Sequence, residues 1–333
     1  MSGVQVPLGS FLFCMKKFFK IFLLISVLLL IISCKGKEKS SVRLGTLKGP
    51  TSMGLSSLID KSHNGETSLS YDVTLSALPE EISTLFLKGD LDVATVPVNL
   101  ASVLYHKSEG KARLISINTE NAIYVLSNAS ESINGVEDMV GKRIVAQGKG
   151  VMPNVILNAI LNSVGMSESD LNITWKAEGS EVVRESLQDP NAILLLPEPY
   201  ASLALDKNKS LKRAFSLTDE WRRKGLGDNV IIAVTIARSE FLKSASKSTI
   251  KALRDDISAS IDEINNNPQA SLKAIDELGI ATYDIASKAI KGISFVNISG
   301  TEAKKELRAY YDVLQGISPK FIGGRAPNED FYE

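Results

Sequence analysis

The chain has 333 residues, which is long enough for two domains, or one large domain, with an ample hydrophobic core. Basic and acidic residues both number 38, but three lysines and no acidic residue precede Cys34, which leaves 35 basic residues against 38 acidic ones after it. This slightly acidic balance argues against a protein that binds nucleic acid or another polyanion.

Cysteine and histidine are too scarce for several common kinds of active site. Cys14 and Cys34 are the only cysteines, so beyond residue 34 the chain has no disulfide, no thiolate nucleophile and no cysteine-bound metal. His63 and His106 are the only histidines, so neither a zinc-binding histidine pair nor a serine–histidine–aspartate triad can be assembled. We therefore expect no enzyme, no metal and no cofactor.

The first 34 residues have the pattern of an export signal. Three lysines between residues 16 and 20 precede an apolar core, residues 21–32, that is short for a membrane span. Ser33 before Cys34 resembles the lipobox of bacterial lipoproteins, with Ile31 in the place of the usual leucine. This resemblance implies that Cys34 is acylated and becomes the first mature residue. A signal anchor with an incidental cysteine is the alternative.

Two short segments flank this signal. Met15 and the lysines after it begin a complete signal by themselves, so we expect residues 1–14 to be an upstream over-assignment of the start codon or a natural extension. Residues 35–41 contain lysine, glycine and serine with one glutamate, a composition that predicts a flexible tether.

From Val42 onward, short apolar runs alternate with helical periodicity in two successive series. In the first series we expect strands at residues 42–47, 69–75, 91–96, 113–118 and 122–127, and helices from Met53, from Pro79 and over 98–107. In the second series we expect strands at 141–146, 173–176, 192–196 and 211–216, and helices at 152–164, at 180–188 and from Pro197 or just after it. A long uncharged strand at 230–237 and helices at 247–266, 269–278, 283–290 and 301–314 follow, and we expect the aperiodic tail from Phe321 to pack as coil on the first lobe.

This alternation predicts an α/β protein in which each of two lobes has a mostly parallel sheet flanked by helices. The chain would cross between the lobes twice, near residues 121–127 and 229–237. The first lobe would then comprise residues 42–127 plus 229–333, and the second lobe residues 128–228.

Polar residues and glycines gather where predicted strands end and helices begin. The loop from Gly45 to Leu55 follows the first strand, and we expect Thr51 or Ser52 to cap the next helix. Three later strand ends repeat the design, and several such ends side by side build a ligand crevice, although each taken singly is an ordinary turn. The residues that we expect to bind a ligand are Lys48, Gly49, Pro50, Thr51, Ser52, Pro97, Asn99, Tyr124, Gly148, Lys149, Met152, Glu198, Pro199 and Tyr200.

Each candidate has a structural alternative. Lys48 and Lys149 suit an anionic group on the ligand, or are solvated surface lysines. Glu198, held between two prolines, suits a ligand N–H, or only caps its helix through the dipole. Asn99 offers both a donor and an acceptor at the end of its strand. Tyr124, like Tyr200, can stack on a planar ligand or simply pack in the core.

Four separated motifs are similar to one known group of proteins. They are Lys48-Gly-Pro-Thr-Ser-Met-Gly54, Gly89-Asp-Leu-Asp-Val-Ala-Thr-Val-Pro-Val-Asn-Leu-Ala101, Pro197-Glu-Pro199, and the ending with Gly323-Gly, Pro327 and Phe331-Tyr332. They resemble substrate-binding lipoproteins of ABC importers in the nitrate/sulfonate/taurine/pyrimidine-precursor (NMT1-like) group. The resemblance covers nearly all of residues 42–332.

The resemblance implies a type II periplasmic-binding-protein fold, whose two α/β lobes close on a ligand around a two-strand hinge. It implies a monomer, exported and anchored by the lipid on Cys34 at a periplasmic or extracellular face. Such a protein captures a small planar or anionic metabolite and passes it to an ABC permease and ATPase. One alternative is a same-fold sensor module, which the absence of neighbouring permease and ATPase genes would favour. Another is an enzyme similar to fungal thiamine-pyrimidine synthases, although these rely on a histidine and a cysteine-rich metal segment.

Overall fold

The computed structural model describes residues 39–332. The predicted export signal and the predicted lipidation site, Cys34, lie outside the described residues. Within the described part of the chain, no helix is both long and apolar enough to cross a membrane.

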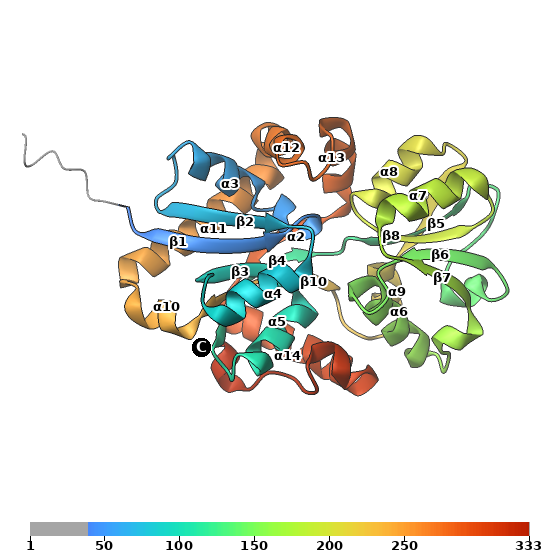
Figure 1. Cartoon of the computed structure of the whole chain (residues 1–333). Helices are drawn as coiled ribbons and strands as arrows, with labels where there is room; N and C mark the ends of the chain where they lie inside the picture. The colour runs from blue at the N-terminus through green and yellow to red at the C-terminus, as the bar shows by residue number, and fades with distance from the viewer. Residues whose placement is uncertain (1–38, 333) are drawn as a thin grey trace, which may run out of the picture. The chain divides into compact units, whose positions relative to one another are not determined.

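A six-stranded sheet forms the centre of what we call the first lobe (Figure 1). Its order is β11 (Ser294–Ile298), β4 (Ala112–Glu120), β10 (Ile231–Arg238), β3 (Val93–Pro97), β1 (Ser41–Leu47) and β2 (Ser70–Ser76). The strand β1 pairs in parallel with β2 and β3, whereas β10 is antiparallel to both β3 and β4. The strands β1 to β4 therefore share one direction, and their carboxyl ends lie along one edge.

A five-stranded sheet forms the centre of the second lobe. Its order is β7 (Asn172–Lys176), β6 (Arg143–Gln147), β8 (Ile193–Pro197), β5 (Ile123–Asn128) and β9 (Leu211–Ser216). The strand β6 is parallel to β7 and β8, and β5 is antiparallel to β8 and β9. Both sheets are mixed, because a strand that follows a crossing, β5 or β10, lies between strands of the opposite direction, but most strands of each sheet share one direction.

Helices cover both sheets, so the α/β prediction is confirmed (Figure 1). The helices of the first lobe are α2 (Pro50–Met53), α3 (Ser56–His63), α4 (Pro79–Lys88), α5 (Val98–Lys107), α10 (Ser239–Ser244), α11 (Lys247–Asn266), α12 (Pro268–Glu277), α13 (Tyr283–Ala289) and α14 (Gly300–Ile317). Those of the second lobe are α6 (Met152–Ser163), α7 (Gly179–Gln188), α8 (Tyr200–Lys207) and α9 (Leu217–Arg223). The predicted strands and helices are present, and β11, α9 and α10 are additional.

The chain crosses between the two sheets twice, and Asn121 joins the crossings. The first crossing is residues 121–122, between β4 and β5, and the second follows α9 and ends at β10. Asn121 adopts a left-handed φ of 55°, its N–H donates to the carbonyl of Val230 at 3.0 Å, and its side chain donates to Asn229 at 3.4 Å. The strand β5 belongs to the second sheet, whereas our sequence-based boundary at residue 128 assigned it to the first lobe.

The tail packs on the first lobe through two short 3-10 turns, η4 (Pro319–Ile322) and η5 (Glu329–Tyr332). Phe331 is fully buried, and the hydroxyl of Ser102 in α5 donates to the carbonyl of Ile322 at 2.6 Å. The carboxyl-terminal segment therefore helps to close the core of the first lobe.

Candidate functional site

The first half of the candidate site lies at the carboxyl edge of the six-stranded sheet. The short helix α2 follows β1 directly and contacts β1, β3, β4 and β10. Its N-cap is Gly49, with φ 119°, and Pro50 is its first residue, so our prediction that Thr51 or Ser52 caps the helix was wrong. A proline after a glycine that can adopt positive φ starts the helix two residues before the Thr51 cap would, and three before the Ser52 cap would. The hydroxyl of Thr119, near the end of β4, donates to the carbonyl of Pro50 at 3.3 Å.

The side chains of two predicted polar residues in this half form no hydrogen bond or ion pair within the described chain. Asn99 is half-buried in the first turn of α5, just after Pro97, which is the N-cap of that helix. Lys48 is exposed, and its ammonium lies 3.6 Å from the position that a Cβ on Gly279 would take. Since Gly279 follows the carboxyl end of α12, Lys48 reaches the negative end of that helix dipole. Thr51 and Ser52 are buried beneath this surface.

The second half of the candidate site lies at the ends of β6 and β8. Gly179, at the start of α7, touches both of these ends: a Cβ there would lie 2.3 Å from the ring of Tyr200 and 2.6 Å from Oε1 of Gln147. Only glycine allows this approach, because real Cβ atoms do not lie so close to other atoms. Oε1 of Gln147 is buried without a hydrogen-bond partner, and burial is the main cause that raises the pKa of Tyr200.

The loop after β6 contains the other predicted residues. Gly148 has a φ of 87° and its N–H donates to the carbonyl of Lys176 at 3.1 Å, which turns the chain toward α6. Met152 is buried at the start of that helix. The side chain of Lys149 is 67% exposed and lies 3.4 Å from Oε1 of Glu168, so in this conformation it forms a surface ion pair.

Glu198 is fully buried, and both of its carboxylate oxygens accept hydrogen bonds from the protein. The backbone N–H of Ser202 donates to Oε2 at 3.0 Å, the hydroxyl of Ser202 donates to Oε1 at 3.1 Å, and Nη2 of Arg213 also bonds to Oε1. Burial raises the pKa of Glu198, and the lowering effects of Arg213 and Ser202 do not cancel it. The helix α8 begins only at Tyr200, after a cis bond before Pro199.

Arg213 connects Glu198 to the first lobe. Its guanidinium lies 4.3 Å from the ring centroid of Tyr124, a cation–π contact. The hydroxyl of Tyr124 donates to the carbonyl of Gly292, which belongs to the turn η3 (Ile290–Gly292) of the first lobe, at 2.8 Å. Nearby, Lys288 of α13 forms an ion pair with Asp206 of α8 at 2.7 Å. Glu198, Arg213 and Tyr124 therefore form a contact between the lobes, here named the Gly292 contact.

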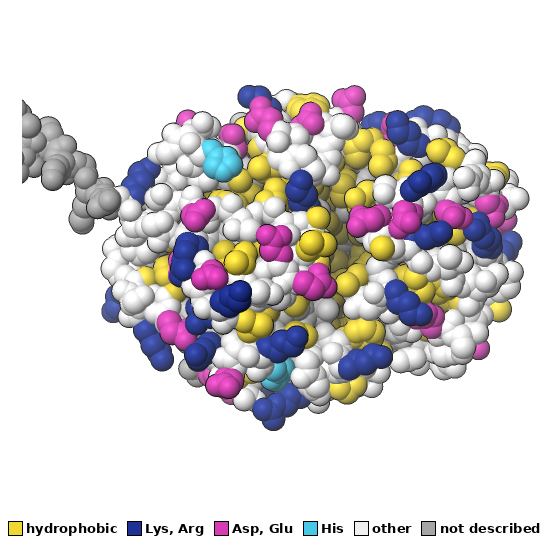
Figure 2. Space-filling view, viewed as in Figure 1, with side chains coloured by type: hydrophobic (Ala, Val, Ile, Leu, Met, Phe, Trp, Pro, Cys, Tyr) yellow, Lys and Arg dark blue, Asp and Glu magenta, His cyan; other side chains and the backbone are white. Residues whose placement is uncertain are grey.

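A hollow separates the two halves of the site. Figure 2 shows it between the lobes, with apolar side chains in its depth and charged side chains along its sides. In Figure 1, α2 and the starts of α6 and α8 lie toward this gap from opposite sides. The strand-end residues thus belong to two surfaces that face each other, and a small polar molecule between them would meet donors and acceptors from both lobes.

Sequence reasoning missed several residues at this site, namely Thr119, Gln147, Gly179, Arg213 and Gly292. Gln147 directly precedes the predicted Gly148 loop, so its position at a strand end could have identified it. The other four residues belong to the site through contacts with residues far along the chain, so a local sequence pattern does not identify them. In the part of the chain that the structure describes, no group of three or more histidine, cysteine, aspartate or glutamate side chains could hold a metal ion.

Comparisons with known proteins agree with this geometry. The family model described as "NMT1/THI5 like" matches residues 72–271, which is more than half of the chain. No curated protein matches the sequence.

Solved structures share the fold at low sequence identity. An ABC transporter structure from Parabacteroides distasonis has a TM-score of 0.72 and 20% identity, covering 88% of this chain and 99% of that one. The periplasmic aliphatic sulphonate-binding protein SsuA from Escherichia coli has a TM-score of 0.67 and 13% identity, covering 90% and 92%. The ligand-binding component of an ABC-type import system from Staphylococcus aureus, with zinc bound, has a TM-score of 0.65 and 13% identity, covering 89% and 97%. The fold is therefore that of periplasmic binding proteins.

Proposed function

This chain belongs to the NMT1/THI5-like family, and from that membership we propose that it is an exported solute-binding protein of an ABC importer. It captures a small molecule between its two lobes and delivers it to a permease that an ATPase drives. The similar structures from Escherichia coli and Staphylococcus aureus are a periplasmic binding protein and an import component, which supports this role.

The observation that carries the proposal is the pairing of two strand-end surfaces across one hollow. Ligands of open α/β sheets bind outside the carboxyl ends of the strands. Here β1 and β3 end on one side of the hollow, and β6 and β8 end on the other. Asn99 on the first side and Gln147 on the second have side-chain polar groups without partners among residues 39–332, which a solute between them could satisfy.

We further propose that the protein is held at the membrane by a lipid on Cys34. Three lysines, an apolar core and Ser33 before this cysteine support the proposal. Residues 35–40 would then separate the anchor from β1, whose first residue is Ser41. A flexible tether of this length lets the binding lobes turn toward a permease in the same membrane.

For the solute we propose a small planar or anionic metabolite. Lys48 is the exposed cation beside the first half of the site, and Tyr200 presents a half-buried ring on the second half. A carboxylate or sulfonate would pair with the lysine, and a flat ring would stack on the tyrosine. The Escherichia coli relative is named for binding aliphatic sulphonates.

A thermal-shift screen of sulfonates, oxyanions, vitamins and heterocycles tests the proposal. A solute that binds the folded protein at about 100 times its dissociation constant adds about 2.7 kcal/mol to the free energy of unfolding. Gln147→Leu should weaken the binding of that solute, whereas the same change at the exposed Gln188 should leave it unaltered. If no small molecule shifts the melting temperature, or if both variants bind equally well, the proposed site is wrong.

A further inference from the structure

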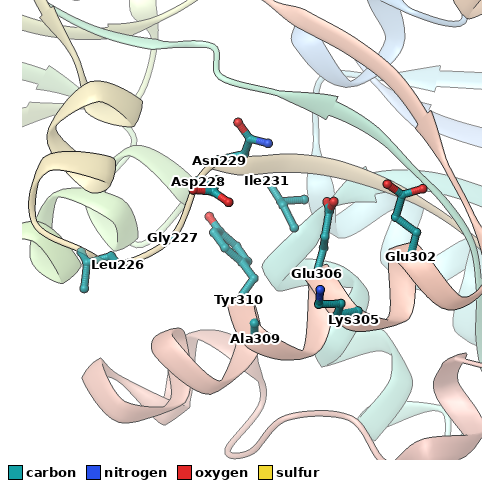
Figure 3. A pocket seen from close by; sticks show the side chains of 10 residues that line it. All are labelled: Leu226, Gly227, Asp228, Asn229, Ile231, Glu302, Lys305, Glu306, Ala309 and Tyr310. Atoms are coloured by element: carbon teal, nitrogen blue, oxygen red, sulfur yellow. The ribbon is translucent and has the colours of Figure 1, made fainter.

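A second pocket lies beside the crossing segments, away from the strand-end surfaces. It has a volume of about 350 Å³ and is bounded by residues 226–229 of the second crossing, by Ile231 of β10 and by one face of α14. Figure 3 shows these side chains converging from the crossing segment above and from α14 below. None of the predicted ligand-binding residues lines this pocket.

The charge of the pocket is strongly negative. Asp228, Glu302 and Glu306 line it, and within the described chain none of them forms an ion pair. Lys305 is the basic residue among the lining side chains; Lys305, Asp228 and Glu302 are exposed to solvent, and Glu306 is half-buried. The pKa of Glu306 is raised, mainly by burial and then by the negative charges of Glu302 and Asp228, although the positive charge of Lys305 opposes this shift. The carboxylates therefore repel one another, and the binding of a cation between them would be favourable.

Tyr310 supplies an independent indication of a ligand. This residue is 4% exposed, and its hydroxyl has no hydrogen-bond partner in the part of the chain that the structure describes. Figure 3 shows this hydroxyl directed into the pocket, toward the crossing segment with Asp228. A buried hydroxyl without a partner costs free energy, so a group that bonds to it here would be stabilising.

A fourth carboxyl group, that of Glu120, does not line the pocket but belongs to the residue paired with Ile231, which does. Glu120 is 3% exposed, its Oε1 atom has no hydrogen-bond partner, and it pairs with Ile231 across the β4–β10 ladder. The negative charge of Glu120 contributes to the raised pKa of Tyr310, and the charge of Glu306 contributes to the raised pKa of Glu120. A bound cation would offset the cost of burying these charges.

We propose that this pocket binds a small organic cation, an amine whose ammonium groups are attracted by Asp228, Glu302 and Glu306 and donate to the hydroxyl oxygen of Tyr310. The negative charge excludes an anion. The described residues include no cluster of three or more metal-ligating side chains with the geometry of a metal site, which favours an amine over a metal ion. The volume of about 350 Å³ is large enough for an organic molecule rather than a single ion. The inference does not depend on the solute site proposed above.

The proposal is tested by calorimetry and melting curves with 1,4-diaminobutane. The purified processed protein is used at pH 7.5 and constant ionic strength. We expect the diamine to bind and to raise the melting temperature, and we expect the uncharged 1,4-butanediol to do neither. If the diol acts as well as the diamine, or the diamine does not bind, the proposal is wrong. If Mg²⁺ or Ca²⁺ binds and the diamine does not, the pocket is a metal site and the proposal is equally wrong.

Three variants locate the binding. Glu306→Gln should weaken diamine binding about tenfold, because a charge-assisted hydrogen bond is lost, and should itself melt at a higher temperature because it relieves repulsion. Tyr310→Phe keeps the buried ring and should weaken binding severalfold without loss of stability. Asp262→Asn removes an exposed charge from α11 and should change nothing. An equal loss of affinity in Asp262→Asn and Glu306→Gln would show general screening and overturn the proposal.

Discussion

Replacing Gly292 with alanine would insert a methyl group into the Gly292 contact between the lobes. The new Cβ would lie 2.9 Å from Oε1 of Glu198, 3.0 Å from the hydroxyl of Tyr124 and 3.2 Å from Nη2 of Arg213. Carbon and oxygen atoms in ordinary contact lie about 3.4 Å or more apart, so all three side chains, or the lobe that bears them, would have to retreat by several tenths of an ångström.

The size of the effect follows from how firmly this cluster is held. Glu198 is fully buried and is held by the backbone N–H of Ser202, so it has little room to move. An extra methyl group in a packed site costs about 1–3 kcal/mol. If the lobes separate to relieve the clash, the closed arrangement loses that free energy and solute affinity falls by about 5- to 150-fold.

Calorimetry with a solute found in the screen, together with melting curves, measures this effect. Gly316→Ala is the matched control, since a Cβ at Gly316 in α14 meets no atom within 4 Å. That variant should keep its solute affinity and gain about 0.5–1 kcal/mol of stability from better helix propensity. A Gly292→Ala protein that melts and binds its solute like the unaltered protein would refute the reasoning.

Three other changes test separate parts of the account. Cys34→Ala should leave an uncleaved, unacylated precursor by mass spectrometry, and palmitate labelling that persists in this variant would disprove the anchor. Burial raises the pKa of Glu120 from 4.5 to about 7, so the folded protein holds this proton more tightly and the free energy of unfolding falls as pH rises through that window. Glu120→Gln should therefore gain about 1–3 kcal/mol relative to the unaltered protein at pH 8 and less at pH 5 in denaturant titrations, and an equal gain at both pH values contradicts this. Glu198→Gln should lose about 1–3 kcal/mol of stability in denaturant titrations because Arg213 loses its partner, and an unchanged dissociation constant for the solute would remove Glu198 from the candidate site.

The sequence was sufficient to predict the fold because its local patterns are strong. Apolar runs such as residues 193–196 and the helical period of α11 specify buried strands and an amphipathic helix without reference to distant residues. The strand β11 was missed because it is short and polar at Asn297, and because its partner, β4, lies far earlier in the chain. The position of β5 in the second sheet likewise depends on pairing with β8 and β9.

The site was predictable only where strand ends identify it. Asn99 and Gly148 follow apolar strands, so their location at a carboxyl edge could be inferred. In the sequence, Arg213 is an ordinary charged residue of a short strand. Its contact with Glu198 depends on the sheet order, in which β9 and β8 flank β5. The acidic pocket combines groups from a crossing segment, β10 and α14, and no local pattern in the sequence unites them.

Small-angle scattering with and without a saturating solute tests the central claim most directly, namely that two lobes close on a ligand around the crossings at Asn121 and Asn229. The account predicts that the radius of gyration falls when the solute is added and that Gly292→Ala reduces this fall. An unchanged radius of gyration at full saturation with a proven solute would contradict it.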